Sequence, residues 1–103
     1  MGATISEFRV EAVTVTVNPA ALGAGPSVAE QTFTVPGLNI GDIVVPIKPT
    51  LTATMFCSGG RVSAANTVAL TLVATAGTPD AASETWTLLV FRPERAQAGA
   101  FNP

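Results

Sequence analysis

The chain has 103 residues, of which 48% are hydrophobic and 12% are charged, and its seven acidic and five basic residues leave a net charge of −2. The charged share is about half that of an ordinary soluble domain, and no basic cluster could neutralise nucleic-acid phosphates or anionic lipids. Apolar runs fall far short of the roughly 20 residues that span a membrane as a helix. We therefore expect no nucleic-acid or membrane partner, and one folded domain whose weakly charged surface is covered by other proteins.

The first predicted strand covers residues 10–17, VEAVTVTV, where apolar and polar side chains alternate. Alternate valines share one face, and β-branched side chains at this period favour a pleated strand. Pro19 follows the strand and ends it, because proline has no amide hydrogen for a β-ladder. In the loop after the strand we expect at most one helical turn, over residues 19–22.

The second and third strands are predicted at residues 29–35 and 43–47, with a turn at Pro36-Gly37 between them. In the third strand, IVVPI, three side chains share one face: Ile43, Val45 and Ile47. Pro46 removes a hydrogen-bond donor from the middle of this strand, which predicts either the edge of a sheet or a β-bulge.

Three further strands are predicted in the middle of the chain. Residues 51–57, LTATMFC, alternate again, and Gly59-Gly60 is expected to turn the chain into a short strand at residues 61–63. A bend at residues 64–66 then leads into a longer strand at residues 68–74.

The last predicted strand, residues 84–91, is apolar on both faces. We assign one face to the core: Trp86, Leu88 and Val90. Leu89 and Phe91 occupy the other face, and a strand that is apolar on both sides requires cover on both sides. This second apolar face predicts contact with another protein.

Seven to eight short strands without helical periodicity predict an all-β fold, namely a single antiparallel β-sandwich or jelly-roll-like domain with extended terminal arms. We assign residues 1–9 to an N-terminal arm, 10–92 to the domain and 93–103 to a C-terminal arm. The C-terminal arm either frays or lies on a neighbouring subunit. The candidate interface residues are Ile5, Phe8, Leu89, Phe91, Arg92 and Phe101. The arginines that could pair with acids across subunits, or stay solvated, are Arg9, Arg61 and Arg92.

The sequence contains no recognisable catalytic constellation. It has no histidine, and Cys57, its only cysteine, has no base to activate it. A thiolate zinc site, a calcium loop and a phosphate-binding glycine motif are all absent. We expect no catalytic residue, no metal and no cofactor, and therefore not an enzyme. An exposed Trp86, the sole tryptophan, would favour sugar binding, but its parity with Leu88 assigns it to the core.

Four stretches together resemble a known family: EQTFTVPGLNIGD (30–42), KPTL (48–51), RVSAANTVALTLV (61–73) and VFRPE (90–94). They are similar to small β-sandwich virion proteins of tailed bacteriophages, chiefly capsid decoration or cement proteins. The resemblance implies a non-enzymatic homotrimer that binds the major capsid protein on the outer surface of the virion and bridges neighbouring capsomers.

Other functions remain open at this point. A phage tail, spike or head-fibre module keeps the same setting with a different position, and a carbohydrate- or receptor-binding β-sandwich is the alternative of a different class. The first residues carry no basic segment followed by an apolar one, so we expect no secretory signal and synthesis in the host cytoplasm.

Overall fold

The computed structural model describes residues 4–98, and the side chains of residues 7–94. The described chain is all-β, as expected, and has no helix. It forms six strands: β1 (Thr4–Val17), β2 (Ser27–Thr34), β3 (Ile43–Ile47), β4 (Met55–Ala64), β5 (Thr67–Ala74) and β6 (Glu84–Ala98). The expected strand number of seven to eight is wrong, and no helical turn forms over residues 19–22.

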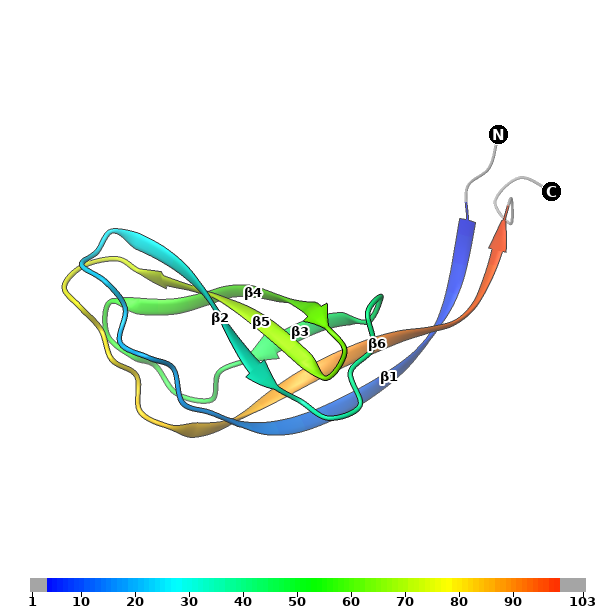
Figure 1. Ribbon diagram of the computed structural model, residues 1–103, viewed down its shortest axis with the longest axis horizontal. Coiled ribbons are helices and arrows are strands. Elements are labelled where there is room, and N and C mark those ends of the chain that lie inside the picture. The colour runs from blue at the N-terminus through cyan, green and yellow to red at the C-terminus, as the bar shows by residue number, and fades with distance from the viewer. Residues whose placement is uncertain (1–3, 99–103) are drawn as a thin grey trace.

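The six strands form two three-stranded antiparallel sheets, with the orders β1-β6-β3 and β2-β5-β4 (Figure 1). This architecture is compatible with a β-sandwich. One hydrophobic core joins the sheets, because both central strands direct alternate side chains into it. The largest fully buried side chains are Trp86 and Leu88 from β6, Leu70, Leu72 and Val68 from β5, and Val17 and Val35. The core face predicted for the last strand is confirmed.

The predicted strand at residues 51–57 is corrected by the structure. Thr54 adopts a left-handed backbone conformation (φ 61°), which interrupts the extended chain, so β4 begins only at Met55. The predicted turn at Gly59-Gly60 is also wrong, since both glycines lie inside β4 next to a register shift. A Cβ atom at Gly60 would lie 3.0 Å from Leu70 Cδ2, so a glycine fits there for reasons of packing.

The short strand β3 lies at the edge of its sheet, as Pro46 predicts. Val44 is its buried residue, and the three side chains that share the other face point to solvent. The prediction of a shared face is therefore right, but the core occupies the opposite side of the strand.

Strands β1 and β6 are the longest and pair with each other from Thr4↔Ala98 to Val17↔Glu84. The predicted end of the last strand at Phe91 is too early. A register shift between Glu7 and Phe8 marks the point where the pair continues as a two-stranded ribbon. Figure 1 shows this ribbon projecting from one end of a molecule of 54 × 27 × 22 Å. The division into arms and domain stays a prediction, but the described parts of the two arms pair with each other.

Candidate functional site

Part of the outer surface of the β1-β6-β3 sheet, next to the threonines that end the same strands, is an uncovered layer of apolar side chains, called the apolar face below. The antiparallel register aligns them in rows across the three strands: Val10–Phe91–Ile43 is one row and Ala12–Leu89–Val45 is the next. Large exposed side chains dominate it: Val10 (53% exposed), Ile43 (52%), Ile47 (46%), Val45 (44%) and Phe8 (42%). With Ala12, Leu89 and Phe91, they make up the apolar face.

The apolar face carries no charged side chain among residues 7–94. Strand alternation directs Arg9, Glu11 and Arg92 to the other side of the sheet, where they line a hollow of about 150 Å³ together with Val13 and Val90. The apolar face is therefore uncharged over the described side chains, and contiguous apolar patches are where proteins contact one another.

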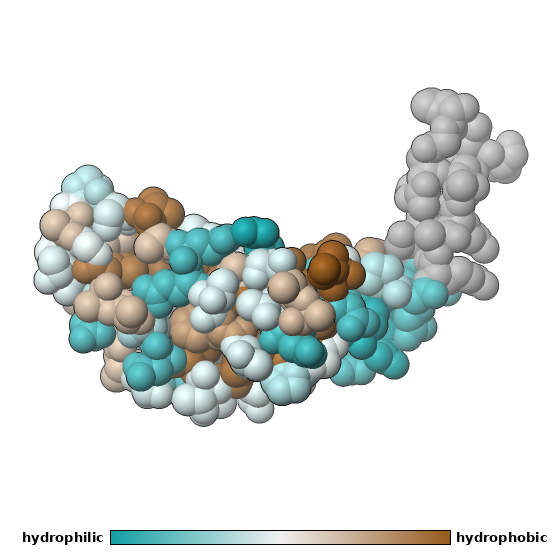
Figure 2. All heavy atoms as spheres, viewed as in Figure 1, coloured by the Kyte–Doolittle hydropathy of each residue, from teal (hydrophilic) through white to brown (hydrophobic). Residues whose placement is uncertain are grey.

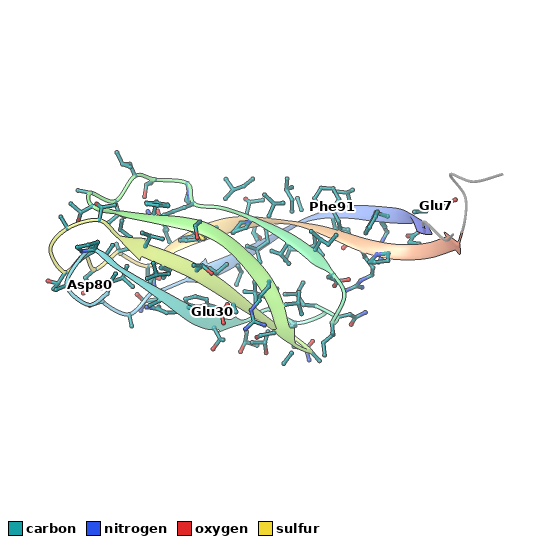
Figure 3. The ribbon with its side chains drawn as sticks, turned by 90° about the horizontal axis from the view of Figure 1, so that it is seen from above. Glu7, Glu30, Asp80 and Phe91 are labelled. Carbon is teal, nitrogen blue, oxygen red and sulfur yellow. The ribbon has the colours of Figure 1, made fainter. Side chains whose placement is uncertain are left out.

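The opposite outer surface, on the β2-β5-β4 sheet, is mixed: it exposes Val28 and Phe56 and also carries an ion pair. Glu30 of β2 and Arg61 of β4 form a two-point ion pair across β5, with Nε–Oε2 at 2.9 Å and Nη2–Oε1 at 2.8 Å. The Arg61 guanidinium lowers the pKa of Glu30 below its ordinary value. Figure 2 shows one side of the molecule, where hydrophilic and hydrophobic residues are interspersed. Phe91 and Glu30, labelled in Figure 3, belong to the two different sheets.

Three of the six predicted interface residues meet on the apolar face. Phe8 is exposed, and Leu89 and Phe91 are half-buried between their neighbours on β1 and β3. Sequence reasoning missed the other large members: Val10, Ile43, Val45 and Ile47. The alternation of IVVPI was a usable signal for three of them, but only the packing of Val44 reveals which side faces outward.

Two predicted interface residues cannot be placed on this face. Ile5 lies on β1 opposite Gln97, with a side chain outside the described residues, and Phe101 lies outside the described residues altogether. Their role in an interface stays a prediction.

Arg92, the last predicted interface residue, points to the other side of the sheet and has a partner within the chain. Its Nε donates to Asp42 Oδ1 at 3.0 Å, and its Nη2 donates to Asp42 Oδ2 at 2.7 Å and to the carbonyl oxygen of Gly37 at 2.5 Å. The Asp42 side chain is only 2% exposed. Hydrogen bonding by Arg92 holds the pKa of Asp42 below its ordinary value, although burial opposes this shift. Arg92 thus fastens the loop between β2 and β3 to β6.

The other two arginines considered for contacts between subunits also have partners in the chain. Arg61 pairs with Glu30, and Arg9 Nε lies 3.0 Å from Glu11 Oε1 and 3.7 Å from Glu94 Oε1. The exposed pair of Arg9 and Glu11 remains accessible to a further partner, with both side chains about half exposed.

The candidates considered for chemistry among the described residues are a reactive thiol, a metal site and a sugar-binding site. Burial raises the pKa of the half-buried Cys57 thiol, which makes it less reactive. No group of three potential metal ligands occurs among the described residues. Trp86 is fully buried and cannot stack on a sugar, and its Nε1 has no hydrogen-bond acceptor within the described part of the chain. The described part of the chain contains no helix that is long and apolar enough to cross a membrane.

Comparisons of the chain with protein-family models, with curated proteins and with solved structures find no match.

Proposed function

We propose that this chain is a structural, non-enzymatic decoration protein of a bacteriophage capsid. Its apolar face binds the outer surface of the assembled major capsid protein, and each copy bridges neighbouring capsomers. The observation that carries the proposal is the uncovered and uncharged outer surface of the β1-β6-β3 sheet. The sequence resemblance to capsid decoration proteins points in the same direction, and we interpret the two-sheet architecture as a small β-sandwich.

The chemistry of the apolar face favours a protein surface as the partner. Nucleic acid and anionic lipid headgroups attract basic residues, whereas this face offers none among residues 7–94. Removing apolar surface from water contributes about 25 cal/mol per Å². Contact with a weakly charged partner surface has the smallest desolvation cost, because no charge of the partner is buried without a counterion.

The size of the apolar face favours an ordered array of binding sites. Three strands about 4.8 Å apart and about seven residues long cover an area of roughly 300 Å². A stable pairwise complex uses roughly 800 Å² from each partner. One copy alone would thus bind weakly, whereas copies joined to one another gain affinity from repeated contacts with the shell. Binding only to the assembled shell stabilises that shell by mass action.

A matched pair of lysine variants tests this proposal. Val45 lies on the apolar face and Val28 lies exposed on the opposite sheet. Val45→Lys is expected to weaken binding at least tenfold to phage heads stripped of decoration protein, because a charge is forced into an apolar contact. Val28→Lys, with the same added charge, is expected to bind like the wild type. The measurement is co-sedimentation with the heads, with urea midpoints to show that both variants are folded.

The result that would overturn the proposal is wild-type protein that does not bind heads, or equal binding by both variants. The copy number per particle separates the alternatives: hundreds of copies indicate a decoration protein, and tens or fewer indicate a tail, spike or head-fibre module. The expected homotrimer stays a prediction that sedimentation analysis of the free protein addresses.

A further inference from the structure

Strand β1 has an open edge. It is the outermost strand of the β1-β6-β3 sheet, and it pairs only with β6. Within the described part of the chain, residues 8–17 make no backbone hydrogen bond outside that ladder. An antiparallel ladder uses one side of a strand, so the N–H and C=O groups on the other side of β1 are available to a further strand.

The short length and the proline that protect the β3 edge are missing from β1. The β3 edge is short and contains Pro46, and β4 is interrupted by two register shifts. By contrast, β1 runs for 14 residues without a proline. Every residue from Glu7 to Ala12 is exposed on this strand, so neither of its faces is covered there. The pairing of β1 with β6 is unbroken from Phe8 to Val17, and long open edges of this kind accept an added strand.

We propose that β1 pairs antiparallel with β1 of a second copy, around a two-fold axis at Val10. An isologous contact of this type joins the same surface of two identical chains. Two features of β1 determine the register. Directly opposite residues share a face of the sheet, so the apolar faces of both copies are continuous only when even-numbered residues oppose even-numbered residues.

The charges select one of these registers. With Val10 opposite the partner subunit's Val10, Arg9 lies opposite the partner subunit's Glu11, and Glu11 lies opposite the partner subunit's Arg9. The neighbouring registers with even-to-even pairing place Arg9 against itself or Glu11 against itself, and like charges directly opposite are destabilising. The selected register also sets Phe8 against the smaller Ala12 on the apolar face.

The pairing has a structural consequence for the whole assembly. It produces a six-stranded sheet in the order β3-β6-β1-β1-β6-β3, with one continuous apolar face that is twice as large as in the single chain. This inference does not depend on capsid binding, because it concerns two copies of the free protein. It extends that function, since a doubled face offers a shell twice the contact area.

Charge exchange between two separate chains provides the first test. R9E alone places its new carboxylate opposite the partner subunit's Glu11, and E11R alone places its new guanidinium opposite the partner subunit's Arg9. Each variant by itself is expected to dimerise at least tenfold more weakly than the wild type, as measured by analytical ultracentrifugation. An equimolar mixture of R9E and E11R is expected to recover dimers, because its two chains oppose unlike charges at both positions. Neither chain regains its internal Arg9–Glu11 pair, so recovery cannot come from that contact.

Cysteine cross-linking provides the second test, in a Cys57→Ser background. Val10→Cys places two thiols opposite each other at the axis, and oxidation is expected to give a covalent dimer. Ala12→Cys is the matched control on the same face, because its counterpart is displaced by four residues, roughly 13 Å along the strand. A wild-type monomer at high concentration, a trimer without the Val10→Cys cross-link, or equal cross-linking at both positions would overturn the pairing.

Discussion

At the scale of single residues, the buried carboxylate of Asp42 helps to position the loop between β2 and β3. It receives two hydrogen bonds from Arg92 and one from the backbone N–H of Asn39 at 2.9 Å. A buried carboxylate is stable only when hydrogen bonds replace its water, and here they also connect residues 50 positions apart. Arg92, which sequence reasoning assigned to an interface, stabilises the fold through this contact.

We expect Asp42→Asn to lower the free energy of unfolding by about 1–2 kcal/mol, the usual worth of a hydrogen bond to a charged group, reduced because Arg92 is partly exposed. Asp80→Asn removes the same charge from an exposed loop residue and is expected to have little effect. Urea denaturation at neutral pH measures both. Equal urea midpoints for the two variants would show that the Asp42 contact contributes nothing.

The same carboxylate predicts a pH dependence. The pKa of Asp42 is lower in the folded chain than in the unfolded chain, so its contribution is fully present above the unfolded pKa of about 3.9. It is lost as the pH falls through the folded pKa. The difference in unfolding free energy between the wild type and Asp42→Asn is thus expected to shrink below about pH 4, which urea titrations at several pH values measure.

At the scale of elements, alternation predicted most strands and the core face of β6, because alternation reports burial on one side. It failed where burial is not one-sided. Residues after Phe91 show no alternation, since β6 there forms a ribbon with exposed residues such as Glu94. The start of β4 depends on the left-handed backbone of Thr54, and the inclusion of Gly60 depends on its distance from Leu70. Neither is a property of the local sequence.

The same limit applies to the candidate site. Leu89 and Phe91 were predicted because their strand is apolar on both faces, which is visible in the sequence. The open edge of β1 was not predictable, because a strand becomes an edge only when the order of the sheet is known.

Two loops at the end of the molecule away from the ribbon approach each other closely. Gly25 N donates to the carbonyl oxygen of Gly77 at 2.7 Å, and a Cβ atom at Gly25 would lie 2.6 Å from the backbone nitrogen of Ala76. Gly25→Ala is therefore expected to cost about 2 kcal/mol in unfolding free energy, because backbone must move. Gly23→Ala, where no atom lies within 4 Å, is the control and is expected to change stability by less than about 0.5 kcal/mol. Thermal unfolding of both variants measures this, and an unchanged Gly25→Ala would contradict the close approach.

At the scale of the whole molecule, the two outer surfaces differ in charge. One carries the Glu30–Arg61 ion pair, and the other carries the apolar face. The difference arises from strand alternation, since Arg9, Glu11 and Arg92 turn away from the apolar face.

This difference predicts how salt affects each contact. Binding of the apolar face to phage heads is expected to change less than about threefold between about 0.1 M and about 1 M NaCl, because screening acts on charges. Dimerisation through β1 is expected to weaken several-fold over the same range, because it includes Arg9 opposite Glu11. Co-sedimentation and ultracentrifugation measure the two separately. Head binding that falls steeply with salt would show that charges, rather than the apolar face, make that contact.

A protein that binds a shell through its apolar face has a fixed orientation on that shell. Each bound copy would direct the β2-β5-β4 sheet, with the Glu30–Arg61 pair, away from the capsid, so this sheet would form the outer surface of the particle. The solution outside the particle would then contact the Glu30–Arg61 pair, together with the exposed Val28 and Phe56 of the same sheet.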